Sequence, residues 1–267
     1  MTITSPQNPR IKQLLALQQK SSERRHTSMF VVEGARELER CINGGFDVDT
    51  VFCCPQLCET SSYGVPLLNI SLPGGVTVVD VTPQVYEKMA YRGSTEGIIA
   101  VVKARPMTLE SITLSENPLI VVLESVEKPG NIGAVLRSAD AAGADAVIVC
   151  DPLTDLYNPN LIRASVGAFF SVPCVACTSE ACIAFLKSHG IRILTAQLQD
   201  SNLYYGTDMR SPVAIVMGTE ATGLTVQWRE AADAHIRIPM LGRVDSLNVS
   251  VSTAILLYEA VRQRQQP

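Results

Sequence analysis

The pattern of apolar and polar positions divides the 267-residue chain into two parts that meet near residue 106. In the first part, short apolar strands alternate with helices that carry one apolar side. We expect helices over Asn8–Lys20, Ala35–Asn43 and Thr82–Met89, a polar turn over Ser21–Ser28, and strands over Met29–Val32, Asp49–Cys54, Val76–Asp80 and Gly97–Val102. The polar stretch Arg105–Pro118 has a proline near each end and marks a boundary. The sequence therefore predicts a smaller αβ domain over residues 1–106.

The second part, residues 107–267, differs because its strands are apolar throughout. These strands are expected over Leu119–Leu123, Ala146–Cys150, Ile191–Ala196, Val213–Met217 and Ile236–Ile238, with helices over Ile132–Ala142 and Ser179–Ser188 and a poorer one near Asp200–Tyr205. Strands that are buried on both faces are typical of a mostly parallel sheet with helices on both sides. We therefore predict an α/β fold whose ligands bind beyond the carboxyl ends of the strands.

The stretch Ala234–Arg262 combines a strand end, an irregular loop and a helix start. Pro239 ends the strand, because proline cannot donate to a β-ladder. The helix is expected to bury an apolar side formed by Leu247, Val251, Ile255 and Tyr258. Ser246 and Asn248 lie at its start, where short polar side chains ordinarily cap free backbone amides. Exposed backbone groups at such a junction also form a ligand cradle.

The exit of the first strand in the second part carries a candidate phosphate-binding group. Pro129-Gly130 forms a turn, Asn131 is expected to cap the next helix, and Arg137 lies off its apolar side. Six residues separate Asn131 from Arg137, which is about 9 Å along a helix axis. The guanidinium can therefore hold phosphate near the helix start. A surface ion pair with Asp140 is the simpler alternative.

A glycine-rich exit follows the strand that ends at Met217. Gly218 and Gly223 allow backbone conformations that other residues avoid. No Lys-Ser/Thr pair follows Gly223, so this segment is not a P-loop, and the chain has no GxGxxG dinucleotide fingerprint. No G-x-S-x-G motif occurs either, which argues against a serine hydrolase.

The net charge of −4 argues against a general nucleic-acid-binding protein. The first 25 residues differ, because they hold five bases and a single acid, Glu23. The bases are Arg10, Lys12, Lys20, Arg24 and Arg25. A basic arm of this kind suits a phosphate backbone, although a solvated helix surface has the same composition.

The eight cysteines lie mostly in apolar, strand-like surroundings, where a free thiol acts as a small hydrophobe. Cys174 and Cys177 form an isolated CxxC with Cys182 nearby. A zinc site ordinarily needs a second ligand pair at matching spacing, so we expect no metal site. No export signal and no apolar run of membrane length is evident, so we expect a cytoplasmic protein without membrane association.

Taken together, three segments resemble, in order and spacing, the motifs of the SpoU (TrmH-type) family of RNA methyltransferases. They are Asn131–Ala139, Gly218–Gly223 and Ile238–Ser250, and Asn158–Ala168 is similar to a further family segment. The resemblance extends over residues 118–264, and residues 5–103 are more loosely similar to the family's substrate-binding domain. Lys128 and Ser252 depart from the family pattern, in which Asp and Ala are usual at these positions.

The resemblance implies an S-adenosylmethionine-dependent enzyme that methylates a ribose 2′-hydroxyl of RNA. It also implies a C-terminal trefoil knot and a homodimer in which the second subunit completes the site. The implied catalytic residues are Arg137, Asn131, Ser246, Asn248 and Glu220. The implied cofactor contacts are Thr195, Ala196, Gln197, Met217, Gly218, Glu220, Gly223, Ile238, Pro239, Met240 and Leu247. The expected RNA contacts are Arg10, Lys12, Arg24, Arg25, Arg137 and Arg163.

Arg137 matches the family's catalytic arginine, which is taken to act as a base or to assist one. A guanidinium with a pKa above ~12 is a poor base at neutral pH, so a phosphate clamp is the other interpretation. The extra N-terminal domain favours rRNA over tRNA as the substrate. The alternatives are a base-methylating knotted enzyme and a non-catalytic RNA-binding relative.

Overall fold

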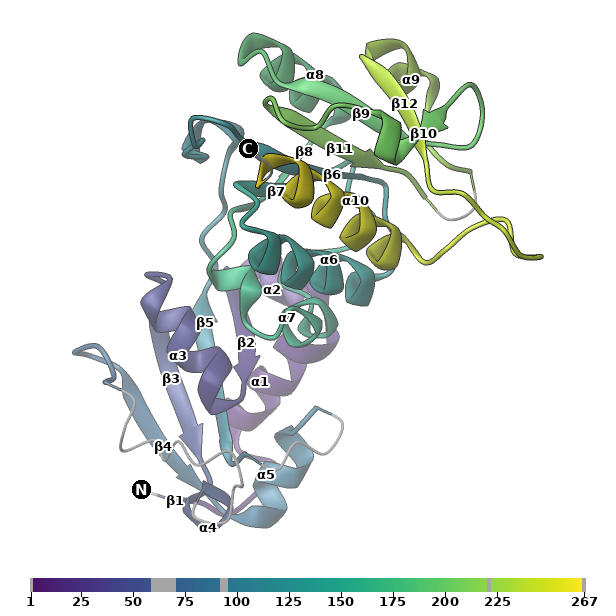
Figure 1. The fold of residues 1–267 in the computed structure, drawn as a ribbon. Helices are drawn as coiled ribbons and strands as arrows, with labels where there is room; N and C mark the ends of the chain where they lie inside the picture. The colour runs from purple at the N-terminus through teal and green to yellow at the C-terminus, as the bar shows by residue number, and fades with distance from the viewer. Residues whose placement is uncertain (1, 59–70, 92–95, 220–221, 266–267) are drawn as a thin grey trace. The chain divides into compact units, whose positions relative to one another are not determined.

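The computed structural model describes residues 2–58, 71–91, 96–219 and 222–265 (Figure 1). The chain forms two compact units, and the first consists of Met1–Arg105 together with Tyr157–Ser171. The second consists of Pro106–Leu156 together with Val172–Pro267. The sequence analysis assigned residues 107–267 to one domain, whereas the contacts place the short segment Tyr157–Ser171 in the first unit.

The first unit is built on a five-stranded mixed sheet with the order β1-β4-β3-β5-β2. Its strands are β1 (Thr2–Ile3), β2 (Met29–Glu33), β3 (Val48–Cys53), β4 (Thr77–Val81) and β5 (Ile98–Lys103). Its helices are α1 (Pro9–Gln19), α2 (Ser21–Thr27), α3 (Ala35–Asn43), α4 (Pro55–Cys58), α5 (Pro83–Met89) and α7 (Pro159–Ser165). The three helices and four strands predicted in this part are confirmed to within one or two residues, whereas β1 was not predicted.

Aromatic packing explains why Tyr157–Ser171 belongs to the first unit. The ring of Tyr157 lies 4.7 Å from that of Phe30 on β2, and Phe170 lies 5.2 Å from Phe46. The hydroxyl of Tyr157 also accepts a hydrogen bond from the backbone amide of Arg105 at 2.9 Å. Paired aromatic rings contribute beyond their buried area, so these rings hold the segment on the first unit.

The prediction of a polar turn over Ser21–Ser28 is wrong, because these residues form α2. Arg24 is only 4% exposed, and its guanidinium Nη1 donates to the carbonyls of Leu17 and Gln18 at the end of α1. These carbonyls would otherwise lack partners at the helix terminus. Arg24 therefore caps α1 and is withdrawn from the surface, and its contact with RNA stays a prediction.

The second unit contains a seven-stranded, fully parallel sheet with the order β10-β12-β9-β11-β6-β7-β8. Its strands are β6 (Leu119–Glu124), β7 (Ala146–Cys150), β8 (Cys174–Cys177), β9 (Arg192–Ala196), β10 (Asn202–Leu203), β11 (Val213–Met217) and β12 (Ala234–Arg237). The predicted α/β fold with a mostly parallel sheet is confirmed. The trefoil knot stays a prediction.

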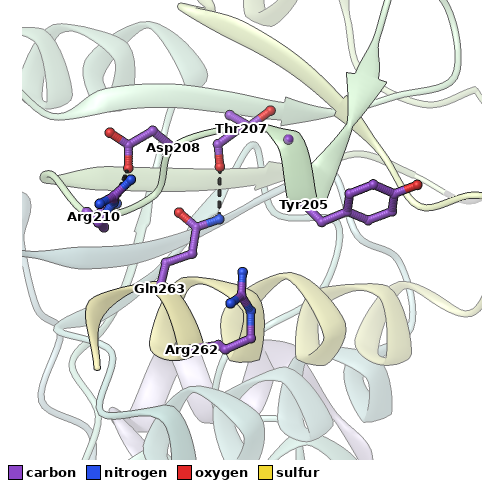
Figure 2. Close-up of a pocket in the computed structure, with 7 residues that line it drawn as sticks. Tyr205, Thr207, Asp208, Arg210, Arg262 and Gln263 are labelled. Carbon is purple, nitrogen blue, oxygen red and sulfur yellow. Dashed lines mark hydrogen bonds and ion pairs between the residues drawn. The ribbon is translucent and has the colours of Figure 1, made fainter. Parts of the chain in front are cut away.

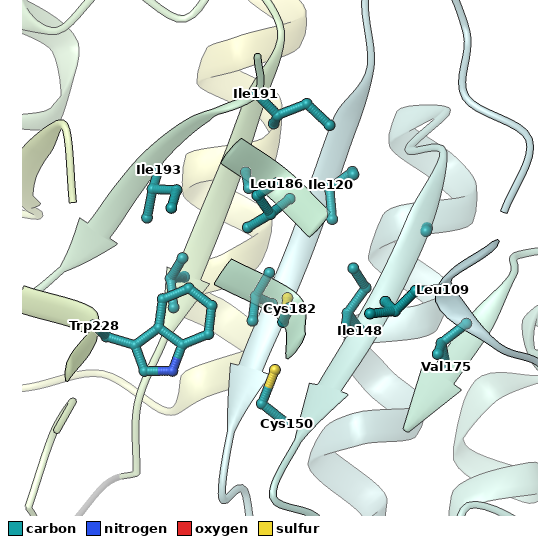
Figure 3. Close-up of a cluster of buried hydrophobic side chains, with 14 of the residues drawn as sticks. Leu109, Ile120, Ile148, Cys150, Val175, Cys182, Leu186, Ile191, Ile193 and Trp228 are labelled. Atoms are coloured by element: carbon teal, nitrogen blue, oxygen red, sulfur yellow. The ribbon is translucent and has the colours of Figure 1, made fainter. Parts of the chain in front are cut away.

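Helices cover both faces of this sheet (Figure 1). They are α6 (Pro129–Ala142) and α10 (Val249–Arg264) on one face, and α8 (Ser179–Ser188) and α9 (Val226–Ala231) on the other. Figure 3 shows the core beneath α8 and α9, where Trp228 and Leu186 pack against strand residues such as Ile148. Every residue of β6, β7 and β11 is buried, which explains their continuous apolar sequences.

The poorer helix expected near Asp200–Tyr205 is wrong. Asn202 and Leu203 are extended and pair with Ile236 and Arg237 of β12, and one 3-10 turn, Tyr204–Gly206, follows. Pairing with a sheet edge therefore overrides the weak helical pattern. Among the described residues, no helix has the length and apolar character needed to cross a bilayer.

The apolar side predicted for α10 is the wrong side. Leu247, Val251 and Tyr258 are 36%, 47% and 50% exposed. The helix instead buries a different set, namely Val249, Thr253, Leu256, Leu257, Glu259, Ala260 and Gln263. Its buried side packs on α6 and β11. Because α10 is apolar on two sides, periodicity alone did not decide which side faces the core.

Polar contacts at the carboxyl end of α10 hold the loop that precedes β11 (Figure 2). Gln263 donates to the carbonyl of Thr207 at 3.0 Å and accepts from the amide of Met209 at 2.8 Å. Gln263 also donates to Glu259, which pairs with Arg262 at 2.8 Å. A surface hollow of about 280 Å³ lies here. The side chains that line this hollow bond to one another and to the loop, so we infer that they anchor α10 to the loop before β11.

Glu259 makes a pH-dependent contribution to stability. Hydrogen bonds from Arg262 and Gln263 lower its pKa below the ordinary value of 4.5. A lowered pKa stabilises the folded state above the unfolded pKa, and this stabilisation is lost as pH falls through the folded pKa. We expect Glu259→Gln to lower the free energy of unfolding by about 1 kcal/mol at pH 7, since Arg262 is half exposed.

Urea unfolding of both proteins at pH 7 and pH 3 measures this difference, which should shrink at the lower pH. The exposed Glu230→Gln on α9 is the control and should match wild type at both values. If Glu259→Gln lowered the free energy of unfolding equally at both pH values, the pH-dependent role of Glu259 would be contradicted.

Candidate functional site

A pocket of about 360 Å³ lies at the carboxyl ends of β9, β11 and β12. Ala196 and Met217, the last residues of β9 and β11, are paired in register. Ala196 is also paired with Ile236 of β12. The three strand exits are therefore level, and their loops open into one space, which is where parallel sheets bind ligands. The start of α10 closes the pocket through Leu247 and Val249.

The exit of β11 folds back on itself. Thr219 and Gly223 exchange backbone hydrogen bonds at 3.3 and 3.1 Å, and Gly223 has a φ of +68°. A Cβ atom at Gly218 would lie 2.4 Å from the carbonyl carbon of Gly223. This position therefore requires glycine, because no side chain fits so close to backbone. Glu220 lies outside the described residues.

Asn248 joins the starts of two helices. Its Oδ1 caps α10 by accepting from the amide of Ser250 at 3.0 Å, as expected of a capping residue. Its Nδ2 donates to Oδ1 of Asn131 on α6 at 3.2 Å. Asn131 is the third residue of α6 and does not cap it, because Pro129 begins the helix earlier, after Lys128. Ser246 is exposed and lines the pocket.

Most of the residues implied as cofactor contacts line this pocket. They are Ala196, Gln197, Met217, Gly218, Gly223, Ile238, Met240 and Leu247. Thr195 and Pro239 do not. Thr195 is fully buried, and its hydroxyl lies 2.6 Å from Nδ1 of His235. Its side chain therefore holds β9 against β12, and a cofactor contact at Thr195 stays a prediction.

Two lining residues have buried polar atoms without a hydrogen-bond partner in the described part of the chain. They are Gln197, through Oε1, and Arg229, through Nε. Buried polar groups are nearly always paired, so an acceptor and a donor left open in one pocket suggest a polar ligand.

Arg229 was missed by the sequence analysis, because α9 itself was not predicted. The carboxylate of Glu124, at the end of β6, positions this helix. It accepts from the amide and the hydroxyl of Thr225 at 2.9 and 2.6 Å, just before α9 begins. Nothing in the local sequence connects Glu124 to Thr225, so only the tertiary structure reveals Arg229 as a lining residue.

Arg137 is exposed on α6 and does not line the pocket of its own chain. The remaining cations expected to contact RNA all lie in the first unit. Arg10, Lys12 and Arg25 are exposed on α1 and α2, and Arg163 is exposed on α7. Of the expected RNA contacts in the first unit, only Arg24 is withdrawn from the surface.

Comparisons with known proteins agree with this architecture. Residues 118–258 match the model of the SpoU rRNA Methylase family, and residues 8–100 match that of the MRM3-like substrate binding domain. The chain is 37% identical over 206 residues to the 23S rRNA (guanosine-2'-O-)-methyltransferase RlmB of Vibrio parahaemolyticus. That match covers 75% of this chain and 83% of the relative.

The solved structures that resemble the chain include two that cover nearly its whole length. A crystal structure of an RNA 2'-O ribose methyltransferase has a TM-score of 0.85 at 40% identity and covers 100% of both chains. The SpoU methyltransferase AviRb from Streptomyces viridochromogenes, in complex with the cofactor AdoMet, has a TM-score of 0.87 at 29% identity. It covers 97% of this chain and 98% of AviRb.

Proposed function

The chain belongs to the SpoU rRNA methylase family, and we propose that it transfers a methyl group from S-adenosylmethionine to a ribose 2′-hydroxyl of ribosomal RNA. The pocket at the level ends of β9, β11 and β12 carries this proposal, because it gathers the strand exits that the family motifs occupy. A relative with this activity aligns with three quarters of the chain and supports rRNA over tRNA.

The pocket suits the cofactor in size and chemistry. Its volume of about 360 Å³ falls within the range of small-molecule sites, about 300–1,000 Å³. Arg229 offers a donor that suits a carboxylate, and Gln197 offers an acceptor that suits an amino group. Met217, Ile238 and Leu247 provide apolar surface. When bound, the cofactor supplies an electrophilic methyl group on its sulfonium.

In the reaction, the chain must orient a ribose hydroxyl and stabilise the charge that develops as its proton leaves. A guanidinium is a donor without an acceptor and is a poor base in proteins. Arg137 therefore clamps a phosphate beside the reacting ribose and stabilises negative charge. The hydrogen bond between Asn248 and Asn131 fixes the start of α6, which carries Arg137, against the start of α10 beside the pocket.

A second copy of the chain brings Arg137 close to the cofactor. Arg137 does not line the pocket of its own chain, and α10 exposes Val251 and Tyr258 next to α6. Tyr258 contacts the carbonyl of Ala141 on α6 at 3.5 Å, so the two helices present one surface. A homodimer formed through this surface covers the apolar side chains and brings Arg137 to the partner's pocket.

The first unit serves as the RNA-binding domain in this proposal. Its residues 8–100 match a substrate-binding domain model, and it exposes Arg10, Lys12, Arg25 and Arg163. These cations bind the phosphate backbone, and they make binding dependent on salt. We also propose that the enzyme works in the cytoplasm, and we retain the C-terminal knot as part of the proposed fold.

Arg137→Ala tests the function and the mechanism together. Wild type should transfer the methyl group of labelled S-adenosylmethionine to 23S rRNA, and the product should resist alkaline cleavage at one ribose. In Arg137→Ala the turnover should fall by about 10²–10³, the typical loss for a group that stabilises developing charge. Cofactor affinity, measured by calorimetry, should stay within about twofold, because the proposed role of Arg137 is to clamp the phosphate of the RNA and not the cofactor.

Arg137→Lys is the matched control, and it should recover part of the activity because it keeps the charge but not the bidentate geometry. Unchanged turnover in Arg137→Ala would remove the residue from the mechanism. A methyl group found on a base, or transfer to tRNA but not to rRNA, would contradict the proposed function.

Mixing two inactive variants tests whether the site is shared between subunits. Gly218→Ala should lose cofactor binding, because the added methyl group meets the backbone of Gly223. Arg137→Ala keeps the pocket but lacks the clamp. In a random mixture of the two, half of the dimers are mixed and each holds one intact site, so about a quarter of wild-type activity should return.

No recovery on mixing, with both variants folded by circular dichroism and subunits shown to exchange, would place the pocket and Arg137 in one chain. Val251→Glu should independently convert the dimer to a monomer in light scattering, because it buries a charge at the proposed interface. A monomeric wild type would contradict the dimer.

A further inference from the structure

Three thiols meet at the carboxyl ends of β7 and β8. The sulfur atoms of Cys150, Cys177 and Cys182 all lie within 4.8 Å of one another. Cys150 ends β7 and is paired in register with Cys177, which ends β8. Cys182 is the fourth residue of α8, which follows β8 directly. We call these residues the cysteine trio, and none of them lines the cofactor pocket.

The fold holds the trio in place before any ligand arrives. Cys150 and Cys182 are fully buried in the core beneath α8 and α9 (Figure 3). Cys177 is partly exposed and gives an ion a route from solvent. Thr178 caps α8 by accepting from the amide of Ala181 at 3.2 Å. This cap fixes the start of α8 and with it the position of Cys182.

The site offers three sulfur atoms as ligands and no carboxylate. The nearest acidic residue in sequence, Asp151, accepts through Oδ2 from the hydroxyl and the amide of Ser179 at 2.6 and 3.2 Å. Ser179 in turn accepts from Nε1 of Trp228 at 2.9 Å. Asp151 is exposed and is engaged through Oδ2 in the hydrogen bonds that order the start of α8, so we take the three thiolates as the ligands.

We propose that the cysteine trio binds one soft metal ion of the Cu(I) class through three thiolates. Thiolate ligands select soft ions, and a bond length of ~2.3 Å around a trigonal centre sets sulfur atoms about 4 Å apart. The observed spacing needs less than about 1 Å of adjustment. Binding releases the thiol protons to solvent. No redox step is involved.

The CxxC motif in the sequence does not form this site. Cys174 lies three positions before Cys177 on β8, and residues an odd number of positions apart in a strand face opposite sides. Cys150, which replaces it, comes from the neighbouring strand. A second pair of thiols, Cys53 and Cys58, has its sulfur atoms 3.5 Å apart in the first unit. Any test must remove this pair.

The test is an anaerobic titration of the reduced full-length chain in a Cys58→Ala background, with Cu(I) supplied as its complex with a coloured chelator. We expect one tightly bound Cu(I) per chain and quenching of the fluorescence of Trp228, the only tryptophan. Cys177→Ala should weaken binding by more than about 100-fold, because loss of an outer-shell group alone costs about 10–100-fold.

Cys174→Ala is the matched control, since it makes the same change on the same strand, and it should bind as tightly as the background. Cys182→Ala repeats the loss from the helix side, in case Cys177→Ala is poorly folded. Equal affinity in Cys177→Ala, Cys182→Ala and Cys174→Ala, or no quenching of Trp228 at one equivalent, would overturn the proposal.

Discussion

The parallel register of β9, β11 and β12 is the constraint on which the proposed site depends. Ala196 is level with both Met217 and Ile236, so three chain exits open into one pocket. A shift of one residue in any pair would move one exit by about 3.3 Å and turn its side chains to the other face. Register is strongly specified where a strand is buried, and every residue of β11, the strand that pairs with β9, is buried.

Two close contacts turn this register into a pocket of defined shape. Gly218 lets the exit of β11 close on Gly223, where no side chain fits. Asn248 caps α10 and at the same time bonds to Asn131, which ties the first and third family motifs together. The pocket is thus lined largely by short loops on a rigid sheet, which is a favourable arrangement for holding a small cofactor.

The sequence predicted most of the strands and the parallel sheet, since buried strands are continuous in apolar residues. It failed where tertiary contacts decide the outcome. Periodicity chose the exposed side of α10, with Val251 and Tyr258, because both sides are apolar. Arg24 was read as a surface base, although it caps α1. Arg229 had no local signal, because α9 is positioned by Glu124 from a distant segment. Cys177 and Cys182 are close in sequence, but the third thiol, Cys150, comes from another strand. The family resemblance named eight of the residues that line the pocket, which spacing alone could not assign.

The most direct test of the central claim is amide hydrogen exchange of the full chain with and without S-adenosylmethionine. Our account predicts slower exchange on cofactor addition in four segments together, namely residues 196–199, 217–219, 236–240 and 245–249, which line or adjoin the pocket. The amides of the first unit should exchange at unchanged rates. Slower exchange confined to the first unit, or to the hollow near Gln263, would contradict the account.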